Sequence, residues 1–192
     1  MKRNQKRPDF FDQVTLLGLL DMYEDHFVGK IYEYETRHRV SPLRIYFEYN
    51  QFPHLIGLHY FNLGRANDIN SKIKSGEITI TTLKEKNPQL YEDEEYRIMF
   101  FSLLAEMMLQ PMIGERTAGP SKVRFYCYDN NYNWVYYLGV SNEGAVNPDQ
   151  YYPMTFIENQ GPIAKKAGRI QAPYKKMRVL DLNGNEIITT SF

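Results

Sequence analysis

Two of the four histidines lie five residues apart in the run NQFPHLIGLHYFNL, residues 50–63, as His54 and His59. An imidazole titrates near neutral pH and can give or take a proton during catalysis. Zinc binding by this pair is disfavoured, because residues five apart in one helix point about 140° away from each other. The run also contains no carboxylate. The pattern therefore favours acid–base chemistry without a metal.

Other common catalytic signatures are missing from the sequence. No serine stands in a Gly-x-Ser-x-Gly elbow, and no glycine-rich phosphate-binding loop is present. The single cysteine, Cys127, alternates with aromatic residues in VRFYCYD and is expected to be a small buried hydrophobic residue. We therefore expect neither a metal nor a cofactor.

Cleavage of RNA through its own 2′-hydroxyl also requires groups that stabilise charge on the phosphate. The chain offers five candidates, four cations and one hydroxyl: Arg97, Lys122, Arg124, Arg44 and Thr155. A purely structural interpretation stands beside this one. A histidine in an apolar run can be a core residue bonded to a backbone carbonyl, and a threonine is a good strand former.

Composition limits the class of protein. The 192 residues include 23 basic and 23 acidic side chains, and this balance argues against coating of duplex nucleic acid while permitting a local basic groove. A hydrophobic fraction of 43% suffices for one core without disulfides. No run approaches the roughly 20 apolar residues of a membrane span. We expect a cytoplasmic protein that does not enter a membrane.

The periodicity of apolar residues predicts an α+β fold, with N-terminal helices and a β-hairpin packed against a C-terminal antiparallel sheet. Helices are expected at 9–27, from Pro53 through the histidine run, at 68–75, 81–87 and 93–111, and strands at 31–49 (a hairpin), 122–129, 133–140, 151–159, 176–184 and 186–192. Pro153 marks its segment as an edge or bulged strand. We expect one domain over 1–192, with 1–8 flexible and 171–192 a hairpin appendage.

The segment FEYNQFPHLIGLHYF resembles the signature of phage-associated nucleases grouped with barnase, EndoU, the RNase colicins and RelE. RIMFFSLL, VRFYCYD, WVYYLGV and YYPMTFIEN follow in the order that this group shows. The resemblance covers residues 23–170. It implies a helical part packed on a four- or five-stranded antiparallel sheet.

The resemblance further implies metal-independent cleavage of RNA to a cyclic phosphate. His54 and His59 match the histidines of the motif, and Thr155 matches the polar residue of the Pro-x-Thr-Phe strand. The resemblance also implies a site role for Arg97, which lies in the segment YRIMFF. The chain departs from the group at Tyr60, where a lysine is expected, and at Ser121 or Lys122, where an aspartate is expected.

Two hypotheses follow, beside a third possibility, a structural phage protein that binds no ligand. The first is a toxin-like or phage effector ribonuclease, with RNA as substrate and a protein antitoxin or inhibitor as partner. The second is a non-catalytic binding or inhibitor protein of the same fold, which would use some of its 16 tyrosines to hold a protein or nucleic acid. Catalysis predicts that His54, His59 and Thr155 converge on one cleft.

Overall fold

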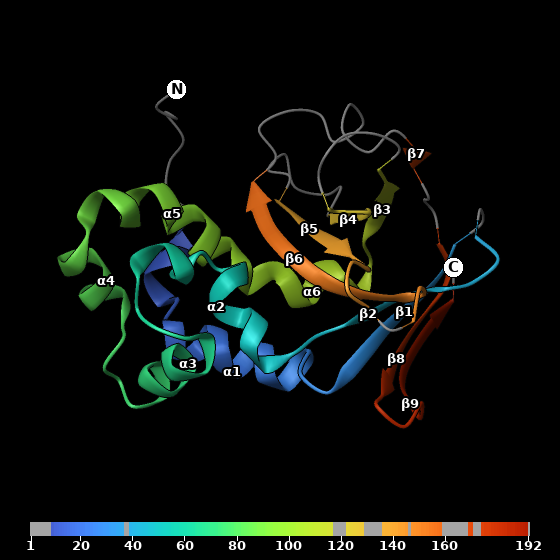
Figure 1. The fold of residues 1–192 in the computed structure, drawn as a ribbon, viewed down its shortest axis with the longest axis horizontal. Helices are drawn as coiled ribbons and strands as arrows, with labels where there is room; N and C mark the ends of the chain where they lie inside the picture. Colours follow the sequence, from blue (N-terminus) through green and yellow to red (C-terminus); the bar gives the residue numbers. More distant parts are fainter. Residues whose placement is uncertain are drawn as a thin grey trace.

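The computed structural model describes residues 9–36, 39–116, 122–128, 136–145, 147–158, 169–170 and 174–191. The helices gather on one side of a long curled sheet (Figure 1), so the expected α+β class is confirmed. The α-helices are α1 (Leu16–His26), α2 (Phe52–Leu55), α3 (Ala66–Lys74), α4 (Ile80–Lys86), α5 (Pro88–Phe100) and α6 (Leu104–Leu109). Residues 1–8, which we expected to be flexible, lie outside the described residues.

Within the described ranges, nine strands form one sheet in the order β7-β3-β4-β5-β6-β2-β1-β8-β9. They are β1 (Lys30–Thr36), β2 (Leu43–Tyr46), β3 (Met112–Glu115), β4 (Phe125–Tyr128), β5 (Tyr136–Ser141), β6 (Gln150–Glu158), β7 (Arg169–Ile170), β8 (Tyr174–Asp181) and β9 (Glu186–Ser191). Neighbours are antiparallel except β2 and β6, which are parallel. The family resemblance implied a sheet of four or five strands, so the observed sheet is larger than expected.

Local sequence signals explain where the helices begin and end. Thr15 caps α1 by accepting a hydrogen bond from the Gly18 backbone N–H, so the helix expected from residue 9 begins later, after a 3₁₀ turn over Asp9–Gln13. Asn87 caps α5 in the same way. The long helix expected up to residue 111 is divided into α5 and α6 by another 3₁₀ turn, Phe101–Leu103.

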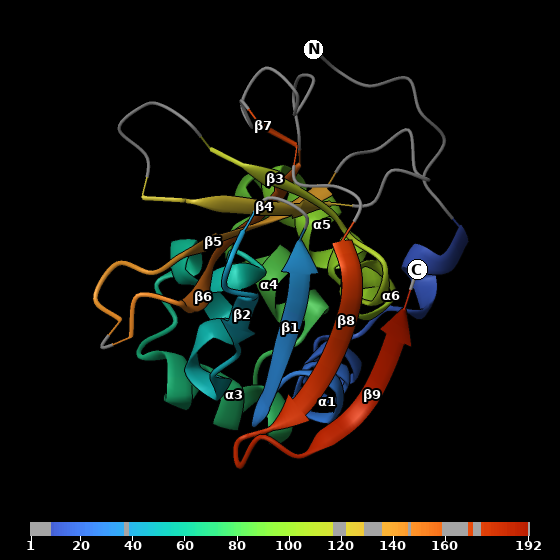
Figure 2. The same cartoon turned by 90° about the vertical axis from the view of Figure 1, so that its right-hand side faces the viewer.

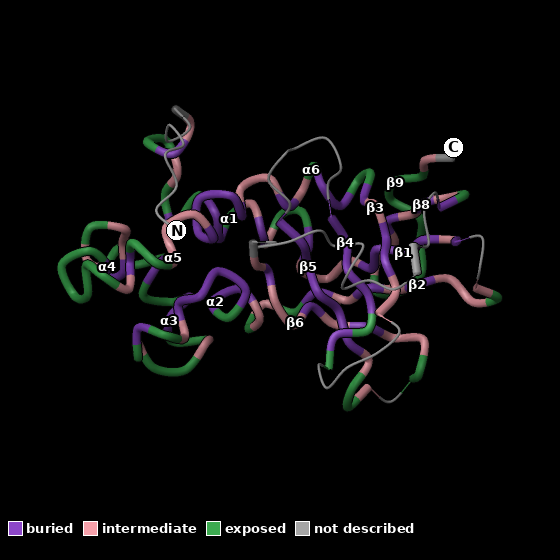
Figure 3. Tube along the Cα trace, turned by 90° about the horizontal axis from the view of Figure 1, so that it is seen from above, coloured by how far each residue is buried: buried purple, intermediate pink, exposed green. Residues whose placement is uncertain are grey.

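The core lies between the helices and the inner face of the sheet. Its largest fully buried side chains are mostly aromatic and come from both layers, among them Tyr23, Tyr34, Phe52, Phe101 and Phe156. Figure 3 shows the buried stretches running through the strands and the inward sides of the helices. Burying a side chain of this size contributes roughly 1.5–3 kcal/mol, so this packing fixes how the helices sit on the sheet. Cys127 is also fully buried, as expected.

The C-terminal hairpin expected at residues 171–192 extends the same sheet. β8 pairs with β1 along its length and β9 forms the outer edge (Figure 2). Gly184, with φ 85°, occupies the predicted Asn-Gly turn. Met177 and Val179 of β8 are buried in the common core, so the hairpin contributes to its packing.

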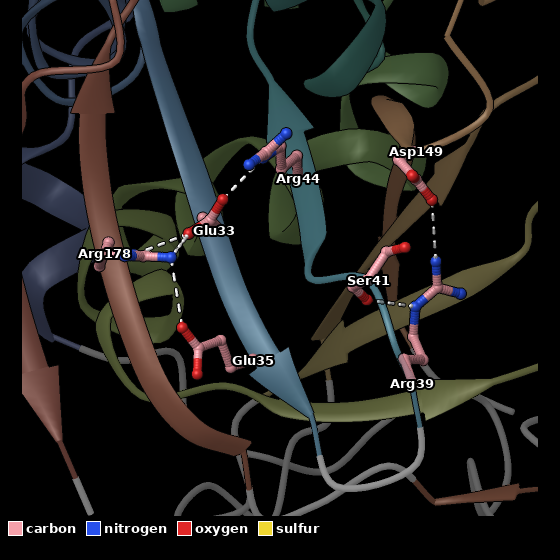
Figure 4. Close-up of polar contacts among 7 residues, drawn as sticks. All are labelled: Glu33, Glu35, Arg39, Ser41, Arg44, Asp149 and Arg178. Atoms are coloured by element: carbon pink, nitrogen blue, oxygen red, sulfur yellow. Dashed lines mark hydrogen bonds and ion pairs between the residues drawn. The ribbon is translucent and has the colours of Figure 1, made fainter.

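A buried carboxylate joins three strands on the outer face of the sheet (Figure 4). Glu33 of β1 is only 1% exposed. It accepts hydrogen bonds from Nε of Arg44 at 2.6 Å and from Nε of Arg178 at 2.7 Å. Arg178 also binds Glu35, at 3.2 Å. This cluster ties β2, β1 and β8 together and engages the guanidinium of Arg44.

Strand β6 contains a bulge at the position that Pro153 predicted. Gly139 of β5 pairs with Thr155, whereas its neighbour Val140 pairs with Pro153, so the ladder skips Met154. A bulge leaves its extra residue outside the regular ladder of hydrogen bonds. The carbonyl of Met154 can therefore bind a group from outside the sheet.

None of the helices in the described part of the chain is both long and apolar enough to cross a membrane.

Candidate active site

The sequence predicted one helix through the histidine run, but the structure shows two separate turns. α2 ends at Leu55, and a separate 3₁₀ turn covers Leu58–Phe61. Gly57 separates them with φ 81°, a left-handed conformation that favours glycine. The side chains of Glu94 and Arg97 also lie where a β-carbon on residue 57 would project. The break therefore has both a conformational and a steric cause.

The break brings the two imidazoles together. The ring centres of His54 and His59 are 4.2 Å apart with 31° between the ring planes. The expectation that the two side chains diverge by about 140° was wrong, because it assumed an unbroken helix. Tyr60 continues the series, with its ring centre 3.9 Å from that of His59. His54, His59 and Tyr60 thus form a row of three rings in contact, each tilted against the next.

His54 is the exposed imidazole, and β6 orients it. Its Nε2 lies 3.0 Å from the carbonyl oxygen of Met154, the residue at the bulge. A carbonyl can only accept, so Nε2 carries the proton and Nδ1 of the neutral ring carries a lone pair. Partial burial lowers the pKa of His54, the Met154 carbonyl opposes this, and the charge of Arg97 lowers it further. His54 is thus a neutral ring with a fixed tautomer.

His59 is the less exposed member of the pair. Burial, then the neighbouring His54, then Arg97 lower its pKa to about 4, and the carbonyls of Pro53 and His54 act in the opposite direction. Its Nδ1 is buried and has no hydrogen-bond partner within the described residues. His59 is therefore uncharged at neutral pH, and two positive rings do not face each other.

Arg97 of α5 holds the backbone that carries both histidines. It is 8% exposed. Its Nε donates to the carbonyl of Leu55 at 2.8 Å, and one terminal nitrogen donates to the carbonyl of His54 at 2.9 Å. The other binds Glu94 at 3.2 Å. Arg97 thus caps the end of α2 and places a positive charge beside the rings.

Substitution of Gly57 tests the geometry of this turn. We expect Gly57→Ala to lower the free energy of unfolding by about 1–3 kcal/mol, because alanine is strained at φ 81° and its β-carbon would collide with Glu94. Gly76→Ala is the matched control, since Gly76 has φ 79° with open space around it. Chemical denaturation of both variants measures the difference. Equal losses would show that the contact with Glu94 is unimportant.

Thr155 lies next to the carbonyl that orients His54. A β-carbon on Gly139 would lie 3.0 Å from Cγ2 of Thr155 and 3.0 Å from Cγ2 of Val123. Thr155 therefore directs its methyl group toward this tight contact between β5 and β6. The structure places Thr155 one residue from the contact between His54 and the sheet.

The other three candidate cations, unlike Arg97, are not described by a contact with the histidine turn. Lys122 and Arg124 are exposed at the start of β4, and Nζ of Lys122 lies 3.0 Å from Glu143. Arg44 is on the outer face of the sheet, where it binds Glu33. The structure therefore brings Arg97 into direct contact with the histidine turn and leaves Arg44 in a separate ion cluster.

A cavity of about 540 Å³ lies elsewhere, within the helical layer. Its walls come from the start of α1, the end of α3 and the start of α4, and include Leu16, Ile73, Ile80 and Lys84. Neither histidine lines it. The imidazole pair is thus separate from this cavity, with His54 exposed at the surface and His59 partly buried.

A family model matches residues 15–183, and its description is phage-Barnase-EndoU-ColicinE5/D-RelE like nuclease 4. The chain belongs to this family. The match confirms the resemblance and identifies a phage-associated nuclease of this type, with the histidine turn inside the matched region. Searches of curated proteins and of solved structures found no match.

Three residues of this candidate site were not among the sequence candidates. Gly57 could have been noted as a glycine inside a predicted helix, which is often a break. Tyr60 directly follows His59 and was noted only as a departure from the expected lysine. Glu94 gave no local signal, because it reaches the turn from α5, through Arg97 and beside Gly57, far along the chain. Ser121, one of the positions for the missing aspartate, lies outside the described residues.

Proposed function

We propose that this nuclease cleaves RNA without a metal ion and that His54 is its general base. The observation that carries the proposal is the orientation of His54. The Met154 carbonyl holds the proton on Nε2, and the lone pair of Nδ1 belongs to an exposed ring whose pKa is lowered. A base of this kind is ready to accept a proton at neutral pH.

In the proposed reaction, Nδ1 of His54 takes the proton of a ribose 2′-hydroxyl. The 2′-oxygen then forms a bond to the adjacent phosphorus while the bond from phosphorus to the 5′-oxygen breaks. The departing 5′-oxygen takes a proton from water and His54 later releases its own to solvent, so the products are a 2′,3′-cyclic phosphate and a 5′-hydroxyl. No oxidant, reductant or nucleotide is consumed.

The surrounding groups support this chemistry in different ways. Arg97 supplies positive charge close to the rings and keeps the pKa of His54 low. His59 packs against His54 as a neutral ring. We propose that Thr155 and the exposed cations Lys122 and Arg124 bind the phosphates of the RNA backbone beyond the bulge of β6. We leave Arg44 in its ion pair with Glu33.

The proposal is tested by cleavage of a single-stranded RNA in excess chelator. We expect fragments that end in a 2′,3′-cyclic phosphate and a 5′-hydroxyl, identified by mass spectrometry. A single-stranded DNA of the same sequence, which lacks the 2′-hydroxyl, should remain intact. Cleavage that needs a divalent cation, or that also cuts the deoxy strand, would contradict the mechanism. Binding without any cleavage would instead favour the non-catalytic alternative.

The pKa of His54 determines the direction of the pH dependence. A general base acts only when it is unprotonated, and a pKa below the usual 6.5 leaves His54 largely unprotonated at neutral pH. We expect kcat/KM to stay level on lowering the pH to about 6.5 and to fall at more acidic pH, by up to about tenfold per unit. A rate that rises steadily from pH 7 to pH 5 would show that a protonated imidazole is required.

A further inference from the structure

An exposed tyrosine, Tyr60, lies at the end of the row of rings that begins with the two imidazoles. Tyr60 is 51% exposed, and its ring packs on His59 with 41° between the planes. The guanidinium carbon of Arg97 lies 5.9 Å from the centre of the same ring. An aromatic ring fixed by its neighbours yet open to solvent can accept a second flat partner.

The backbone holds this ring in a defined place. The 3₁₀ turn that carries Tyr60 lies between Gly57 with φ 81° and Asn62 with φ 52°. Asn62 is the one residue other than glycine with positive φ in the described ranges. Unusual backbone conformations of this kind persist where the surrounding structure constrains them, and they are common at ligand sites. The position of the Tyr60 ring is therefore built into the fold.

We propose that Tyr60 is a stacking platform for an unpaired nucleobase and that the substrate is single-stranded RNA or an RNA loop. This inference rests on the proposed function, because it takes His54 as the base that acts on the neighbouring ribose. The base that stacks on Tyr60 belongs to a nucleotide adjoining the scissile phosphate, since only His59 separates the Tyr60 and His54 rings.

The restriction to unpaired RNA follows from the geometry of stacking. Bases inside a duplex have both faces covered by other bases, and the deep groove of an RNA helix does not admit side chains. A single strand can splay one base onto an aromatic ring, with little dependence on which base it is. The equal numbers of acidic and basic residues also argue against coating of a duplex. We therefore expect weak sequence preference and strong preference for single strands.

Binding of a non-cleavable strand tests this directly. The probe is a fluorescent single strand of eight 2′-O-methyl nucleotides, measured by anisotropy, beside a duplex of the same sequence. Stacking of one base predicts that Tyr60→Ala weakens binding of the strand by about 5- to 100-fold, while Tyr60→Phe stays within about twofold of the original protein. Tyr46→Ala is the control, because Tyr46 is a partly exposed tyrosine on β2. It should leave binding unchanged.

A lysine at this position gives a second, independent measurement. Tyr60→Lys replaces a stacking ring by a phosphate-binding charge, so its affinity should fall more steeply with salt, by about 0.7 in the logarithmic slope. Original affinity of Tyr60→Lys at high salt, where its added charge is screened and only the lost stacking should remain, would overturn the proposal. So would equal affinity of Tyr60→Ala and the original protein, or tighter binding of the duplex than of the single strand.

The design separates this inference from the proposed function. The probe lacks a free 2′-hydroxyl, so its binding does not depend on cleavage. If Tyr60→Ala loses binding but His54→Ala cleaves ordinary RNA at the original rate, the stacking site stands and the catalytic assignment fails. If cleavage depends on His54 but Tyr60→Ala binds the probe normally, the catalytic assignment stands and the stacking site is wrong.

Discussion

Replacement of His54 by alanine is expected to lower the rate of RNA cleavage by about 10²- to 10⁴-fold, the usual contribution of a positioned acid–base group. The side chain is exposed, and within the described part of the chain it is held by a hydrogen bond to the carbonyl of Met154. Its removal should therefore leave the fold unchanged. Initial rates in excess chelator and the thermal unfolding midpoint measure the two effects separately.

Two further variants show whether proton transfer is the property that matters. His54→Gln can still donate a hydrogen bond to Met154 but cannot accept a proton near neutral pH, so we expect the same loss of rate as with alanine. His26→Ala is the matched control, because His26 is an exposed histidine at the end of α1. Full activity in His54→Gln would show that His54 only positions its neighbours.

Replacement of Arg97 by leucine is expected to have the largest effect on stability. The substitution leaves the carbonyls of His54 and Leu55 and the carboxylate of Glu94 without their guanidinium partner. Breaking a buried ion pair from one side typically costs about 3–5 kcal/mol. Chemical denaturation measures the loss. Arg124→Leu is the control, and an exposed cation of this kind should change stability by about 0.5 kcal/mol or less.

The same position links stability to the pH dependence of catalysis. Arg97 lowers the pKa of His54, so Arg97→Leu should move the acid limb of the rate profile toward higher pH. Arg97→Lys keeps the charge but loses the planar set of donors, so its acid limb should stay close to the original while its stability still falls. An unshifted limb in Arg97→Leu would mean that the charge of Arg97 does not reach His54.

Much of the fold could be predicted from local patterns. The alternation around Ile31 and Ile45 predicts the hairpin of β1 and β2, and the Asn-Gly pair at 183–184 predicts the turn between β8 and β9. Pro153 predicts the bulge in β6, although this strand lies inside the sheet. Such features depend on neighbouring residues, so the sequence carries their signal directly.

The contacts that form the site depend on residues far apart in the chain. His54 meets Met154 across 100 positions, and Arg97 meets His54 across 43. No periodicity reports such contacts. Gly57 is the instructive case, because glycine within an apolar run is compatible with either a helix or a break. The side chains of Glu94 and Arg97 favour the break. The sequence therefore identifies the two histidines as candidate site residues, whereas it does not predict that their rings are in contact.

Chemical rescue tests most directly the claim that the imidazole of His54 is the base that cleaves RNA. The His54→Ala protein is assayed in excess chelator with increasing concentrations of free imidazole, and the His54→Gln protein, which should be equally impaired but whose side chain still fills the place of the imidazole, serves as the control. The account predicts that imidazole restores cleavage only to His54→Ala, with a pH dependence that follows the added base and with cyclic phosphate as the product. Original activity of His54→Ala without imidazole would contradict the account.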